Sequence, residues 1–125
     1  MLNKKTNKEG GEKTVELLEI FEKVNLIIPI EQRKFFNYFE DTVEELESMY
    51  SGFVVEKDAE FTPPSSLSET TVVLPLYKSA IVDNIIFLNT GEEARKSEFI
   101  RKSREAYLKY WCDNAKCKKI KGRKW

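Results

Sequence analysis

The stretch from Ile30 to Tyr50 constrains the fold of this 125-residue chain more than any other. Its apolar residues recur every three or four positions with acidic residues between them, which is the pattern of an amphipathic helix facing a core. The apolar stripe consists of Phe35, Phe36, Phe39, Val43, Leu46, Met49 and Tyr50, and the acidic side of Glu40, Asp41, Glu44, Glu45 and Glu47. Pro29 suits the first turn, because its missing N–H would be unpaired there, and Gly52 suits a left-handed cap. We predict a central helix about 30 Å long.

Three further segments carry a helical pattern. Residues 14–25 predict a short amphipathic helix, residues 75–89 a helix opened by Pro75, and residues 92–113 a last helix. Gly91 can adopt the left-handed backbone that ends a helix, so the last two helices are expected to form an antiparallel hairpin. The residues predicted to face inward are Leu76, Ala80, Ile81, Ile85 and Leu88, then Phe99, Ile100, Ser103, Ala106, Tyr107, Tyr110 and Trp111.

The middle of the chain has no helical period. Phe53–Val55 and Thr71–Leu74 are apolar or β-branched, and the proline-rich segment 61–66 between them has the composition of a loop. A short β-hairpin or an irregular segment is expected here. The fold class is therefore mainly α, with about four helices in one domain over 14–113, a flexible basic arm over 1–13 and a basic tail over 114–125.

The residues that support most enzyme chemistry are missing. The chain has no histidine, no glycine-rich phosphate loop and no Gly-x-Ser-x-Gly turn. Cys112 and Cys117 cannot complete a four-coordinate zinc site, and a disulfide between them would close a very short loop, so two reduced thiols are expected. The pairs Glu44-Glu45 and Glu92-Glu93 are adjacent in helices and do not face each other. We expect no enzyme activity, no metal and no cofactor.

Charge is divided along the chain although the total is zero. From Arg95 to Trp125 there are twelve Lys or Arg against three Asp or Glu, a net charge of +9, and residues 1–94 carry −9. This asymmetry bears on association rather than on fold.

The basic ending is the predicted interface. Its candidate residues are Lys118, Lys119, Lys121, Arg123, Lys124 and Trp125. A basic tail of this kind meets nucleic-acid phosphates, meets the acidic surface of another protein, or is simply solvated. Contact with acidic protein is favoured, because the chain itself supplies an acidic surface, and the terminal tryptophan suits an interface.

No segment has the length or composition for a membrane span or a secretory leader. The longest apolar run, Leu26–Ile30, is broken by Pro29, and no apolar stretch follows the basic start. A cytosolic origin without a membrane partner is expected.

Four segments of the chain are similar to small head–tail connector (adaptor, or head-completion) proteins of tailed bacteriophages. They are Leu74–Asn84, Asn89–Glu93, Ser103–Trp111 and the basic ending Lys119–Trp125. The likeness extends over roughly residues 14–125, whereas the first helix and its lysine-rich arm are not demanded by it.

The resemblance implies a structural protein of a phage or prophage neck. Such a protein forms a ring of identical subunits between portal and tail, in the virion neck or in the bacterial cytoplasm before assembly, with portal and tail-completion proteins as partners and DNA close by. Head-to-tail contacts make such rings from two different complementary surfaces, which a divided charge could supply. The alternative function is a small nucleic-acid-binding regulator that uses the same basic tail.

Overall fold

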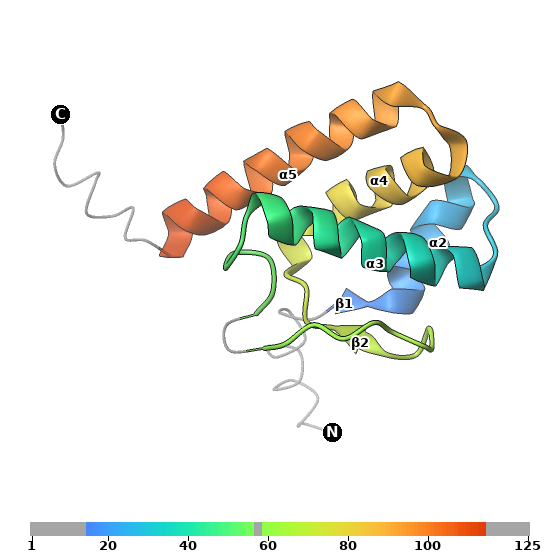
Figure 1. Ribbon diagram of the computed structural model, residues 1–125, viewed down its shortest axis with the longest axis horizontal. Coiled ribbons are helices and arrows are strands. Elements are labelled where there is room, and N and C mark those ends of the chain that lie inside the picture. The colour runs from blue at the N-terminus through green and yellow to red at the C-terminus, as the bar shows by residue number, and fades with distance from the viewer. Residues whose placement is uncertain (1–14, 57–58, 115–125) are drawn as a thin grey trace, which may run out of the picture.

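The computed structural model describes residues 15–56 and 59–114 (Figure 1). The expected arm over 1–13 and the tail beyond Asn114 lie outside these residues. The described elements are β1 (Val15–Glu16), α2 (Leu17–Ile27), α3 (Gln32–Met49), β2 (Thr70–Thr71), a 3₁₀ turn (Pro75–Tyr77), α4 (Lys78–Thr90) and α5 (Glu93–Asn114). The mainly α fold class is confirmed.

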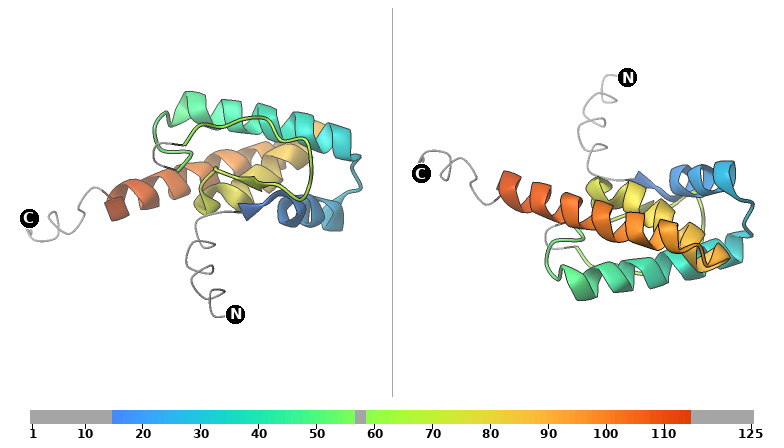
Figure 2. Two further views of the ribbon diagram at one scale, coloured as in Figure 1. Left: turned by 90° about the horizontal axis from the view of Figure 1, so that it is seen from below. Right: turned by 90° about the horizontal axis from the view of Figure 1, so that it is seen from above.

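Helix α4 lies in the middle of the helices. Its seven consecutive residues from Ala80 to Ile86 are all buried, so no side of this stretch faces water. α5 runs antiparallel along α4, which confirms the predicted hairpin, and α2 and α3 lie on opposite sides of α4 in both views of Figure 2. The long helix α3 packs along one side of α4.

Helix α3 buries the predicted stripe. Phe35, Phe39, Val43 and Leu46 are inaccessible, and Phe35 packs with Phe21 of α2 as an edge-to-face ring pair. Met49 at the end of the stripe is exposed. A period of 3.6 residues therefore placed the core face of α3 correctly.

Both ends of α3 differ from the prediction. Pro29 does not open the helix, because residues up to Glu31 stay extended and the Asn25 side chain accepts the Ile30 N–H at 3.2 Å. At the other end Tyr50 is the last half-helical residue, and Gly52 has a φ of 88° in the turn that follows. The prediction of a positive φ at Gly52 is confirmed, but the prediction that Gly52 caps the helix was wrong, because the capping residue is Tyr50.

The middle segment is held by short antiparallel pairings. Val55 and Val73 form an isolated bridge, flanked by hydrogen bonds from the Glu56 N–H to the Val72 carbonyl and from the Leu74 N–H to the Val54 carbonyl. The two β-branched segments therefore meet as the sequence suggested.

The first predicted helix begins later than expected. Val15 and Glu16 pair with Thr71 and Thr70 as a two-stranded sheet, and the Leu17 N–H donates to the Glu69 carbonyl. The prediction of helix from residue 14 was wrong at this end, because hydrogen bonds to a distant segment replace those of a helical first turn. Thr14, the expected cap, lies outside the described residues.

The hairpin of α4 and α5 keeps most of its predicted core. Phe99, Ser103 and Ala106 are buried, Tyr107 and Tyr110 are half-buried, and Ile100 and Trp111 are exposed instead of inward. Among the described helices none has the length and apolarity to cross a membrane.

Cys112, near the end of α5, is disulfide-bonded, so the expectation of two reduced thiols was wrong. The length of the closed loop governs how much a disulfide stabilises, whereas local geometry governs whether it forms. Cys117 lies outside the described residues.

Candidate functional site

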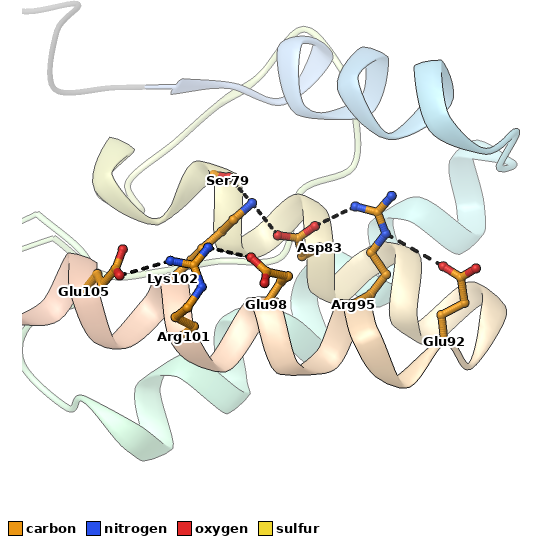
Figure 3. A network of polar contacts seen from close by, with 8 residues as sticks. All are labelled: Ser79, Asp83, Glu92, Arg95, Glu98, Arg101, Lys102 and Glu105. Atoms are coloured by element: carbon orange, nitrogen blue, oxygen red, sulfur yellow. Dashed lines mark hydrogen bonds and ion pairs between the residues drawn. The ribbon is translucent and has the colours of Figure 1, made fainter.

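A buried carboxylate joins α4 to α5 (Figure 3). The Asp83 side chain is 3% exposed and lies between two cations of α5. The Arg95 guanidinium donates to its Oδ1 at 2.9 Å, and the Lys102 ammonium lies 2.7 Å from its Oδ2. Lys102 directs its hydrogen bond to the Ser79 hydroxyl at 2.9 Å, so its contact with Asp83 is an ion pair rather than a well-aligned hydrogen bond. The negative charge of Asp83 is thus balanced inside the fold by two cations of the neighbouring helix.

A second buried polar group joins three helices. The Asn84 amide of α4 donates to the Thr42 hydroxyl of α3 at 2.9 Å, and Lys96 of α5 donates to the Asn84 oxygen at 3.3 Å. Lys96 also pairs with Glu45 of α3 at 2.6 Å. These contacts set the register of α3 and α5 against α4 and leave Asn84 satisfied.

Stacked tyrosines hold the middle segment against the hairpin. The Tyr77 hydroxyl donates to the Phe53 carbonyl at 3.0 Å, and the ring of Tyr50 stacks between those of Tyr77 and Tyr107. Burial, followed by the nearby Tyr50 hydroxyl, raises the pKa of Tyr77 well above its ordinary value. Tyr77 is therefore a neutral structural hydrogen-bond donor.

A basic groove of about 390 Å³ opens between α2, α4 and α5. Its lining residues are Lys23, Leu26, Ile27, Lys78, Ser79, Val82, Asp83, Arg95 and Lys102. Four cations and one carboxylate line it, and that carboxylate is already paired with two of the cations. Leu26, which is 86% exposed, and Ile27 form an apolar rim. The groove suits an anionic group carried on a partly apolar surface.

The outer side of α3 is an acidic face, formed by Glu40, Asp41, Glu44 and Glu47. Asp41 and Glu44 are exposed, and Glu40 and Glu47 are half-buried. Glu45, their neighbour in sequence, turns instead to Lys96, so Glu44 and Glu45 diverge as predicted. The face carries only negative charge.

The outer side of α5 is an apolar stripe. Ile100, Leu108 and Trp111 lie on one side of the helix with Arg104 between them, at spacings of four, four and three residues. Leu108 is 54% exposed and Trp111 is 41% exposed. Near this stripe the exposed Arg101 bonds Glu98 and Glu105, and its hydrogen bond to Glu98 lowers the pKa of that carboxyl (Figure 3).

The predicted interface residues, Lys118, Lys119, Lys121, Arg123, Lys124 and Trp125, lie outside the described residues. The buried roles of Asp83 and Asn84 were not predicted from the sequence, although two polar residues inside an apolar run could have indicated them. Within residues 15–56 and 59–114 no cluster of acidic or cysteine side chains is arranged to hold a metal.

Neither a protein-family model, nor a curated protein, nor a solved structure matches the chain. The function has to be inferred from the three surfaces: the basic groove, the acidic face and the apolar stripe.

Proposed function

We propose that this chain is a non-enzymatic structural protein of a phage or prophage neck. Its subunits form a ring between the portal and the tail through head-to-tail contacts. The observation that carries the proposal is the apolar stripe on α5, the helix whose C-terminal turns run past the rest of the domain (Figure 1).

An apolar stripe on a projecting helix is suited to contact with another protein. Leu108 and Trp111 lie in the last two turns of α5 and are 54% and 41% exposed. Tryptophan and arginine are the residues most enriched at interface centres, and Arg104 lies one turn away. The portal protein is the occupant that we assign to this stripe.

The polar groups of the domain support a structural role. Asp83 and Asn84 are paired with residues of the neighbouring helices, and the Tyr77 hydroxyl is bonded to a backbone carbonyl. These groups stabilise helix packing and present no nucleophile with an adjacent base. Rings also require two different complementary surfaces on each subunit, and the basic groove and the acidic face are two such surfaces.

Deleting the coding region from a lysogen tests the proposal. Induced particles are expected to be filled heads with separate tails, and the intact gene supplied in trans is expected to restore joining. Normal tailed particles from the deletion strain would overturn the neck assignment. Affinity of the purified chain for duplex DNA that falls steeply with salt, together with normal particles, would indicate the nucleic-acid-binding alternative instead.

A further inference from the structure

We propose that the basic groove of one copy receives the acidic face of α3 of a second copy. This inference rests on the proposed function, since it names the two surfaces that meet between neighbouring subunits of the ring. It assigns no role to the apolar stripe, which is left for a different protein.

The groove has unused positive charge. Of its four cations, Arg95 and Lys102 share Asp83, and Lys78 pairs with Glu19 of α2. Arg95 also pairs with the exposed Glu92 at 3.7 Å. Lys23 pairs with no carboxylate in the described part of the chain. With four cations against Asp83, Glu19 and Glu92, the groove retains one positive charge, that of Lys23, which belongs to the same helix as the exposed Leu26.

The negative charge of the acidic face is not balanced by ion pairs in the described part of the chain. Glu44 lies three or four residues from each of Glu40, Asp41 and Glu47 on α3, a spacing at which like charges repel. Across residues 15–56 and 59–114 none of these four carboxylates forms an ion pair. A cationic surface placed against α3 would relieve this repulsion.

The chain cannot join these two surfaces within itself. α3 lies on one side of α4, and α2, which forms one wall of the groove, lies on the other (Figure 2). A second copy is the partner of matching charge that is always present at the same concentration. Because the two surfaces differ, the contact is head-to-tail and leaves one surface of each kind open for the next copy.

The size of the groove determines how α3 would bind. A volume of about 390 Å³ accepts several side chains but not a whole helix. α3 therefore lies across the rim, packed as a ridge on the groove between α2 and α5, with Asp41 and Glu44 directed toward Lys23.

Charge reversal tests this contact in the full chain. Lys23→Glu and Glu44→Lys are chosen because neither residue has an ion-pair partner in the described structure, so neither change leaves a buried charge unpaired. Sedimentation velocity at low salt is expected to show concentration-dependent association of the native chain, and each single variant is expected to associate at least about tenfold more weakly. Lys109→Glu and Glu60→Lys are matched controls outside both surfaces, and are expected to associate as the native chain does.

Restoration is the decisive part. The two single variants mixed together, and the double variant Lys23→Glu/Glu44→Lys alone, are expected to associate again because opposite charges meet at every contact. Carbodiimide coupling of the native chain is expected to join Lys23 to Asp41 or Glu44 between isotopically distinct copies. A native chain that stays monomeric and uncoupled, single variants that associate normally, or a mixture that does not recover would each overturn the inference.

Particle formation separates this inference from the neck assignment. If the single variants complement the deletion strain fully while the empty vector does not, the neck role is supported and the groove contact is refuted. If the single variants associate weakly and their mixture recovers, but the deletion strain makes normal tailed particles, the groove contact is supported and the neck role is refuted.

Discussion

The carboxylate of Asp83 on α4 lies 2.9 Å from the guanidinium of Arg95 on α5, with the acid almost fully buried and the base about one-third exposed. Lys102, exposed to a similar degree, lies on the other carboxylate oxygen. The pair is therefore asymmetric: either cation can turn to water when its partner is lost, whereas the carboxylate cannot. Breaking a buried pair is costly mainly because of the charge left behind.

This asymmetry predicts an order of stability. Arg95→Ala combined with Lys102→Ala leaves Asp83 buried without a cation and is expected to lower the free energy of unfolding by about 3 kcal/mol. Asp83→Asn keeps the shape and frees two solvent-accessible cations, so it is expected to cost about 1 kcal/mol. Urea unfolding measures both. Arg101→Gln, in an exposed pair, is the control and should be close to neutral; an Asp83→Asn variant less stable than the double variant would contradict the prediction.

Gly91 ends α4 in a conformation that other residues resist. Its φ is 80°, its N–H donates to the Phe87 carbonyl, and a Cβ placed there would meet no other atom within 4 Å. The cost of Gly91→Ala is thus conformational rather than steric, and should lower the free energy of unfolding by about 1 kcal/mol. Gly91→Asn should cost less, because asparagine tolerates the left-handed region better. Thermal unfolding of both variants checks this, and equal stability of the alanine variant would refute it.

Tyr77 makes the free energy of unfolding depend on pH in the alkaline range. Its pKa is raised in the folded state by burial, so the neutral phenol favours folding. This contribution is complete below the ordinary pKa of 10.0 and is lost as the pH rises above it. The native chain should therefore lose more stability than Tyr77→Phe between about pH 8 and pH 11, where the other tyrosines and the lysines act equally on both.

At neutral pH, where the Tyr77 phenol is protonated in both states, the native chain is expected to be the more stable of the two proteins. Tyr77→Phe gives up the hydrogen bond to the Phe53 carbonyl and is expected to be less stable by about 1 kcal/mol at neutral pH. Parallel pH profiles of the two proteins in urea unfolding would show that Tyr77 does not titrate in this way.

The apolar stripe should be dispensable for folding and needed for joining. Leu108→Lys combined with Trp111→Lys is expected to lower the free energy of unfolding by no more than about 1 kcal/mol, because Leu108 is 54% and Trp111 is 41% exposed. The same double variant is expected to fail to restore tailed particles in the deletion strain. Lys109→Ala, an exposed neighbour, is the control. Full restoration by the double variant would remove the stripe from the neck contact.

Much of the local structure could be predicted because its causes are local. The spacing of Phe35, Phe39, Val43 and Leu46 located the core face of α3, and Gly91 marked the end of α4. The prediction that Pro29 opens α3 was wrong. A proline restricts only its immediate neighbours, and here the Asn25 side chain accepts the Ile30 N–H, so the backbone stays extended up to Glu31. The start of α2 was also misjudged, since Val15 pairs with Thr71, which is far away in the sequence.

The buried role of α4 could not be predicted in the same way. A helix that is covered on every side shows little contrast between its faces, so its pattern did not distinguish the buried Asp83 and Asn84 from polar residues at the surface. Their partners, Arg95 and Thr42, belong to two other helices. The sequence predicted that α4 and α5 meet, but it did not indicate which of their residues pair, nor that α3 packs against α4.

The sequence by itself determined that the chain is mainly helical, where its helices lie and that its charge is divided, since these depend on periodicity, proline, glycine and composition. Only the tertiary structure decided that α4 is enclosed and that the acidic face of α3 and the basic groove lie on opposite sides of it. Lys23, Lys78 and Lys102 come from three different helices, and their meeting depends on how apolar faces pack, which is a property of the whole fold.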